Sequence, residues 1–247
     1  MLEIQIASDL HIESRKDKHL DPLDYFTPVA EILILAGDIG SLYMFDQFQN
    51  FMKKTCELFT YVIFIAGNHE YYVRKGYKHL EMNILKKKLQ NIETEIDNFY
   101  FLDKSSIKIG NVCIVGCTLW SETNNVPHNR VKIPDMSVEK YNMLHKQDLN
   151  YIKQMIKYCK KRDLKLFLVT HYCPTFDILP QKDEFSNLYC TNLNKLIETG
   201  AVDVWVFGHL HYNVDKIMKG GTHLVGNQKG KKRDCLTTYS LTKTISI

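Results

Sequence analysis

Aspartate and histidine residues occur in this chain in short clusters whose spacing suits metal binding. Asp9 and His11 are separated by one residue, as are His209 and His211. Residues two apart on an extended chain point the same way, so each pair can present two ligands to one ion. Carboxylate oxygens and imidazole nitrogens together suit zinc, manganese or iron better than calcium. These clusters therefore indicate metal chemistry.

Three further residues of the same ligand type follow other apolar segments. Asp38 and Asn68 each come directly after a glycine, and His171 follows a hydrophobic run. A glycine lets the backbone turn sharply and approach an ion or a phosphate closely. A carboxylate such as Asp38 can bridge two ions about 3.5–4 Å apart, the spacing used in phosphoryl chemistry.

Each cluster taken alone also fits an ordinary structural role. Asp38 suits a helix cap, and Asn68 suits a turn. His69 and His171 suit hydrogen-bonded positions in a core. Five clusters at five successive strand ends favour the metal interpretation over five separate structural ones.

The segments before these clusters are short, apolar and rich in β-formers: residues 4–7, 31–36, 61–66, 164–170 and 202–207. They lack clean alternation, which is typical of strands buried on both faces. Ligands of open α/β sheets bind beyond the carboxyl ends of strands. We therefore expect the five clusters to converge on one crevice.

Helical periodicity separates several of these strands. It predicts helices over residues 80–96, 141–156 and 193–196, the last ending near Gly200. Residues 107–109, 112–115 and the tail 236–247 are expected to be meander or hairpin strands. The pattern predicts an α/β layered domain with mixed sheets. Residues 121–136 are polar and contain two prolines, which predicts a long loop facing the substrate.

Length and composition are those of a globular domain. The chain has 247 residues, 45% hydrophobic and 24% charged, and we expect one domain over residues 1–247. No apolar run approaches the roughly 20 residues of a membrane-spanning helix, so no membrane partner is expected. The N-terminus does not resemble a secretory signal. Seven cysteines without a Cys-x-x-Cys pair indicate reduced thiols and a cytoplasmic location.

The charge pattern gives little support for a nucleic-acid partner. The net charge is +4, and a basic cluster lies near the C-terminus: Lys229, Lys231, Lys232 and Arg233. We interpret this cluster as a solvated loop rather than a contact to a phosphate backbone.

The ordered motifs Asp-x-His, Gly-Asp, Gly-Asn-His-Glu, His and Gly-His-x-His resemble those of the calcineurin-like metallophosphoesterase superfamily. The resemblance extends from Asp9 to His211, nearly the whole chain. It implies a β-sandwich of mixed sheets flanked by helices, in four layers α-β-β-α, with the site at one edge. It also implies two bound ions of manganese, iron or zinc.

The resemblance assigns a role to each matching residue. His69 corresponds to a catalytic histidine that contacts substrate, and Glu70 to a residue that orients its neighbours. Asp38 bridges both ions. The remaining ligands divide into one set for each ion: Asp9, His11 and His211 for one, and Asn68, His171 and His209 for the other.

The implied activity is hydrolysis of a phosphate ester by a metal-activated hydroxide. The family's Ser/Thr phosphatases and diadenosine hydrolases continue the second motif as Gly-Asp-x-x-Asp-Arg-Gly, whereas residues 37–42 read Gly-Asp-Ile-Gly-Ser-Leu. The substrate class that remains is a small phosphomonoester, phosphodiester or nucleotide. The alternative function is a scaffold that keeps the fold without catalysis. An intact ligand set argues against it.

Several residues near the motifs are candidates for substrate contact, and packing is the alternative role for the aromatic ones. The oligomeric state is not indicated. Residues 226–230 are expected to be structural. The substrate candidates are Tyr71, Tyr72, Arg74, His128, Arg130, Tyr172 and Tyr212.

Overall fold

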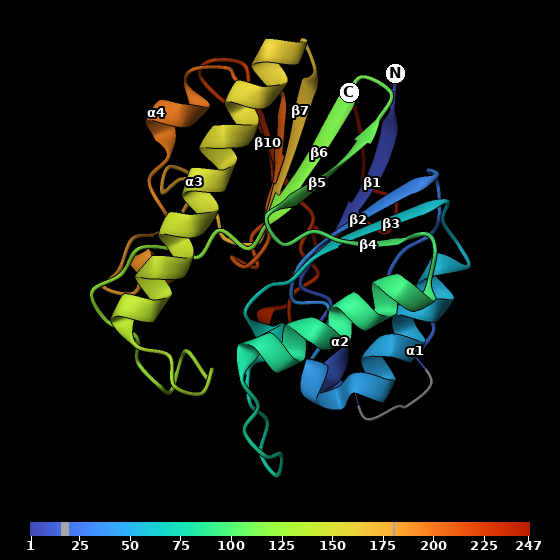
Figure 1. Ribbon diagram of the computed structural model, residues 1–247, viewed down its shortest axis with the longest axis vertical. Coiled ribbons are helices and arrows are strands. Elements are labelled where there is room, and N and C mark those ends of the chain that lie inside the picture. Colours follow the sequence, from blue (N-terminus) through green and yellow to red (C-terminus); the bar gives the residue numbers. More distant parts are fainter. Residues whose placement is uncertain (16–19, 180) are drawn as a thin grey trace.

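Two mixed β-sheets pack face to face, and helices cover both outer faces (Figure 1). The computed structural model describes residues 1–15, 20–179 and 181–247. The expected α/β layered architecture is therefore confirmed.

The first sheet has the strand order β11-β1-β2-β3-β4. Strands β1 to β4 are parallel, and β11 pairs antiparallel with β1 at the edge. Strand β2 is buried along its whole length, which explains its unbroken apolar sequence. The strands are β1 (Glu3–Ala7), β2 (Ile32–Ala36), β3 (Tyr61–Ile65), β4 (Phe99–Phe101) and β11 (Thr244–Ser246).

The second sheet has the strand order β5-β6-β7-β8-β10-β9. Its four central strands are parallel, and both edge strands run antiparallel to their neighbours. The strands are β5 (Ser105–Ile109), β6 (Val112–Cys117), β7 (Lys165–Thr170), β8 (Val204–Val206), β9 (Val214–Ile217) and β10 (His223–Gly226).

The inner faces of the sheets share one apolar core. Side chains of alternate positions meet between the sheets, among them Ile34, Ile63, Ile114, Phe167 and Val206. The outer faces pack against helices. In Figure 1, α1 (Phe45–Cys56) and α2 (Met82–Glu95) lie on the first sheet, and α3 (Val138–Arg162) and α4 (Asn194–Ile197) lie on the second.

The structure adds one helix that the pattern did not predict and corrects one expected strand. Helix α1 was not predicted, although Phe48, Phe51 and Met52 give it a buried stripe. The expectation of strand structure over the whole tail 236–247 is wrong, because only Thr244–Ser246 pairs with β1. Part of the tail backbone is held by a side chain instead, since the Asn227 amide nitrogen donates to the Ser240 carbonyl oxygen. The loop 121–136 contains no helix or strand.

One buried carboxylate outside the expected metal site gives a test of the fold. Asp148 on α3 accepts a hydrogen bond from Leu119 N at 2.8 Å, and Lys104 Nζ lies 3.5 Å away. Burial raises the pKa of Asp148 to about 6, although the Lys104 charge opposes this rise. Between about pH 4 and pH 6, Asp148 therefore keeps a proton in the folded chain that the same side chain loses in the unfolded chain.

We expect this proton to make the wild-type chain less stable as the pH rises through that range. Relative to Asp148→Asn, which cannot ionise, its free energy of unfolding should fall by about 3 kcal/mol between pH 4 and pH 7. Urea denaturation of both proteins at each pH measures the difference. Parallel pH dependences of the two would contradict this role.

Candidate active site

The expected ligand residues lie at one edge of the sandwich. Asp9, Asp38 and Asn68 follow β1, β2 and β3 of the first sheet. His171 and His209 follow β7 and β8 of the second. Because these strands are parallel within each sheet, their carboxyl ends meet at the same edge. The structure therefore brings these side chains together in one crevice, as the sequence predicted.

The side chains form three overlapping groups, each able to hold a metal ion. Within each group the ligand atoms lie within 4.8 Å of one another. The groups are Asp9 with His11 and His211, Asp38 with His171 and His209, and His11 with Asp38 and His69. The first two match the division implied by the family resemblance. The third means that distance alone also allows His69 as a ligand.

Two histidines face each other across the first group. His11 Nε2 and His211 Nε2 are 3.0 Å apart. The opposite ring nitrogens contact carboxylates: His11 Nδ1 lies 3.2 Å from Glu13, and His211 Nδ1 lies 2.5 Å from Asp234. In each ring Nδ1 faces a carboxylate, and Nε2 is the nitrogen that remains to bind an ion. The donor set therefore fits a metal ion.

The second group has the same design with backbone partners. His171 Nδ1 lies 2.9 Å from the Ala36 carbonyl oxygen, and His209 Nε2 lies 3.1 Å from the Leu188 carbonyl oxygen. Each ring therefore donates outward and turns its other nitrogen inward. Asn68 Oδ1 lies 3.0 Å from His171 Nε2, which brings Asn68 into this group.

The backbone is unusual at these positions. Asp9, Asp38 and His209 have φ values of 54°, 54° and 73°, and His11 and His211 have values of 49° and 51°. This left-handed conformation costs a non-glycine residue about 1–3 kcal/mol and is common at functional sites. It turns the chain sharply after each strand and aims the side chains into the crevice.

Two glycines allow the carboxylates to approach the neighbouring backbone. A Cβ added to Gly67 would lie 2.7 Å from Asp38 N, and one added to Gly208 would lie 2.7 Å from Asp9 Oδ2. A Cβ atom cannot lie that close to another heavy atom unless the surrounding structure shifts. The glycines of the third and fifth motifs are therefore required by space.

Glu70 ties the second motif to the third. Its carboxylate accepts hydrogen bonds from the backbone nitrogens of Asp38, Ile39, Gly40 and Gly67 at 2.8–3.2 Å. Burial and the Asp38 charge raise the pKa of Glu70 to about 8, while the hydrogen bonds act in the opposite direction. Its contacts fit the expected orienting role.

The charges of the metal-free site depend on strong coupling between buried groups. Burial raises the pKa of Asp9, but the hydrogen bond with His211 and nearby histidine charges outweigh it and bring the pKa to about 2. Burial lowers the pKa of His171, but Asp38 raises it to about 9. Burial and the His171 charge lower the pKa of His209 to about 3. Ionised carboxylates thus lie beside a neutral His209 and a charged His171.

Glu13 is a functional candidate that the sequence analysis missed. Its Oε1 lies 3.2 Å from His11 Nδ1 and 3.3 Å from His69 Nδ1. Burial raises the pKa of Glu13, but the hydrogen bonds with both histidines bring it to about 2. The ionised carboxylate contacts both rings through Nδ1, so His69 Nε2 faces the cavity. Its position two residues after His11 was the available signal.

Asp234 and Gln228 were also missed as supporting residues. Asp234 contacts His211 Nδ1, and Gln228 Oε1 accepts a hydrogen bond from His211 N at 2.6 Å. Gln228, in the segment expected to be structural, therefore orients His211 directly. No motif of the sequence marks Asp234, which lies 23 residues from His211.

A cavity of about 630 Å³ opens over these groups, and only some substrate candidates line it. Tyr72 and Arg130 line it, together with Asn129 and Lys132 from the loop 121–136. Arg74 lines a smaller cavity of about 300 Å³, whose wall also includes His69 and Tyr72.

The other candidates lie elsewhere, so the structure corrects their expected place. Tyr71 and Tyr172 are each 1% exposed, and Tyr172 packs behind His209 with 4.3 Å between ring centroids. These rings belong to the core, which was the alternative role for them. His128 and Tyr212 are exposed, and neither belongs to the lining of the cavities described here.

Comparison with known proteins places this site in a family. The model of the family described as calcineurin-like phosphoesterase matches residues 2–213. The chain belongs to the calcineurin-like phosphoesterase family. It is therefore a metal-dependent hydrolase of phosphate esters. A search of curated proteins gives no significant match.

Solved structures share the phosphoesterase fold at low sequence identity. The phosphopantetheinyl hydrolase of Mycobacterium tuberculosis superimposes with a TM-score of 0.74 and 18% identity, over 98% of this chain and 95% of that one. A dimetal phosphatase of Danio rerio gives a TM-score of 0.52 and 12% identity, over 91% and 86%. A protein of Thermus thermophilus gives 0.57 and 12%, over 92% and 89%.

Two further observations concern the setting of the phosphoesterase. Across the described residues, no helix has both the length and the apolar character needed to cross a membrane. All seven cysteines are free thiols, and six of them are buried.

The contacts of Glu13 predict a loss of activity on neutralisation. In Glu13→Gln the histidines lose their charged partner, and we expect turnover to fall about 10- to 100-fold, the scale for residues behind metal ligands. Phosphatase activity measured across a range of metal concentrations tests this. Glu31→Gln, an exposed control, should retain full activity, and equal rates for both variants would refute the role of Glu13.

Proposed function

We propose that the protein hydrolyses a small phosphomonoester, phosphodiester or nucleotide with two ions of manganese, iron or zinc. Asp38 would contact both ions. The remaining ligands would be Asp9, His11 and His211 for one ion, and Asn68, His171 and His209 for the other.

One observation carries this proposal. Side chains from four strand ends lie within ligand distance as two groups of three that share no residue. Asn68, after a fifth strand, lies 3.0 Å from His171 Nε2 of the second group. In both groups the histidines donate outward and leave a nitrogen for an ion. Two bound ions supply a water of lowered pKa and neutralise charge on the phosphoryl group.

His69 is the proposed catalytic residue. Glu13 accepts from its Nδ1, so its Nε2 faces the cavity, where Lys231 Nζ lies 3.2 Å away. Burial lowers the pKa of His69, which keeps the ring neutral at pH 7. We propose that the Lys231 ammonium group gives a proton to His69 Nε2 and that His69 passes this proton to the departing oxygen of the substrate.

The cavity walls supply contacts for the rest of the substrate. Tyr72 and Arg130 are the expected contacts that line it, and Arg130 is held there by a 2.8 Å hydrogen bond to Tyr189. Because the similar mycobacterial structure is named a phosphopantetheinyl hydrolase, phosphopantetheine diesters belong in a substrate screen. We further propose that residues 1–247 act as one domain in a reducing, cytoplasmic setting, which the free thiols support.

Hydrolysis of model esters tests the proposal directly. We expect the protein to cleave p-nitrophenyl phosphate or its bis ester with added Mn²⁺, and a chelator to abolish this. Asp38→Asn should lower turnover by about 100-fold or more, because a key electrostatic contact is lost. Asp97→Asn, exposed and distant from the motifs, is the matched control. Absence of cleavage of both esters at every metal concentration would favour a scaffold role instead.

The role of His69 is tested separately from metal binding. We expect His69→Ala to lose activity by about 100-fold while keeping both ions, because the proposed ligands are intact. Elemental analysis of the purified variant measures the ions, and the exposed His79→Ala serves as its control. Loss of an ion from His69→Ala alone would make His69 a ligand, as the group with His11 and Asp38 allows.

A further inference from the structure

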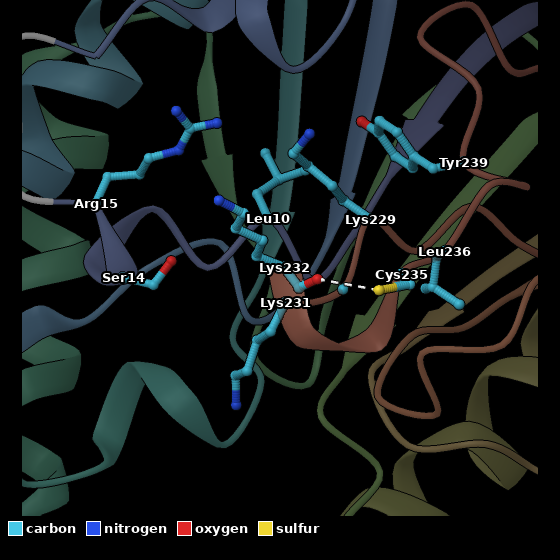
Figure 2. A pocket seen from close by; sticks show the side chains of 10 residues that line it. Leu10, Ser14, Arg15, Lys229, Lys231, Lys232, Cys235, Leu236 and Tyr239 are labelled. Atoms are coloured by element: carbon cyan, nitrogen blue, oxygen red, sulfur yellow. Dashed lines mark hydrogen bonds between the residues drawn. The ribbon is translucent and has the colours of Figure 1, made fainter.

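A second cavity of about 630 Å³ lies beside the metal site, and its lining is basic (Figure 2). Arg15, Lys229, Lys231 and Lys232 line it, and Tyr239 forms part of its wall. In Figure 2 the ends of Lys229 and Lys232 point to the side where the Arg15 guanidinium lies, whereas Lys231 points away from them. Three of these cations come from the cluster that the sequence suggested was a solvated loop.

These cations lack a directly paired carboxylate in the described part of the chain, although the Asp24 charge acts on Lys229. Among the residues that the structure describes, no carboxylate forms an ion pair with Arg15, Lys229, Lys231 or Lys232. Burial and the Arg15 charge both lower the pKa of Lys229. Cations gathered around a cavity repel one another unless an anion binds among them.

Aromatic rings lie near two of these cations, and a backbone hydrogen bond holds the loop that carries the lysines. Lys229 Nζ lies 5.3 Å from the centre of the Tyr25 ring and 5.5 Å from that of Tyr239, and Arg15 Cζ lies 5.8 Å from Tyr25. Lys229 N donates to Ser8 O at 3.0 Å, next to the first metal motif. The loop that carries the lysines is therefore anchored to the end of β1 rather than free in solvent.

The basic cavity and the metal cavity share part of their walls. Lys231 and Leu236 line both. Lys231 Nζ contacts His69 Nε2, and Leu10, between the proposed ligands Asp9 and His11, lines the basic side. A molecule bound at the metal site can therefore extend past Lys231 into the basic cavity.

We propose that this cavity binds a second phosphate group of the substrate, which makes the substrate a phosphate ester with at least one further phosphate. The inference rests on the proposed function, because the phosphate that is hydrolysed would sit at the metal site. Binding of the second phosphate can be tested without measuring hydrolysis. A free nucleoside bisphosphate and the end of a nucleic acid strand both present this chemistry.

Calorimetric titration of the full chain as purified tests the subsite. The probes are adenosine 3′,5′-bisphosphate, adenosine 5′-monophosphate and a short single-stranded DNA with a 5′-phosphate. We expect the bisphosphate to bind about tenfold or more tightly than the monophosphate, the scale of one charge-assisted hydrogen bond. Tighter binding of the DNA than of the bisphosphate would identify a nucleic acid as the source of the second phosphate.

Charge-removing variants locate the effect. Lys229→Gln and Arg15→Gln should each reduce the preference for the bisphosphate about tenfold, and Lys157→Gln, exposed on α3, should not change it. Equal affinities for both nucleotides, or an unchanged preference in both variants, would overturn the proposal. Hydrolysis of p-nitrophenyl phosphate by the same wild-type sample is measured separately. Its absence would reject the proposed catalytic function and leave the binding result to decide the subsite.

Discussion

Two buried carboxylates, Asp9 and Asp38, require hydrogen-bond donors or positive charges around them, and the rest of the site supplies these partners. Asp9 is 0% exposed and Asp38 is 2% exposed, and a buried ionised carboxylate is costly unless partners surround it. The protein supplies backbone donors: His209 N contacts both oxygens of Asp9 at 3.1 Å, and His69 N contacts Asp38 Oδ1 at 2.8 Å. Histidines complete the surroundings, and metal ions fit among them.

The residues behind the ligands form a continuous support. Glu70 joins the turns after β2 and β3, and Glu13 links His11 to His69. Asp234 fixes His211 and also accepts from Lys231 N at 2.7 Å, so one carboxylate orients a ligand and shapes the basic loop. The geometry of the site and the position of the basic loop therefore both depend on Asp234.

The sequence predicted the parts of this protein that follow from short-range patterns. The apolar runs located five strands, and the polar residues after them located the side chains that converge on the crevice, because chain direction decides where parallel strands end. Glu13 could have been found from its spacing to His11. Asp234 could not, because its contact with His211 depends on how the last loop returns to β1. Tyr172 was misjudged because adjacency to a ligand does not show on which side of the strand a ring packs.

The left-handed turns have a consequence for how this protein can change. Asp38 and His209 are in conformations that glycine adopts freely, and Asp38 also adds a buried negative charge. Selection for catalysis therefore opposes selection for thermal robustness at these positions. In a descendant that no longer needs catalysis, substitution of these residues would relieve the backbone strain and raise the melting temperature.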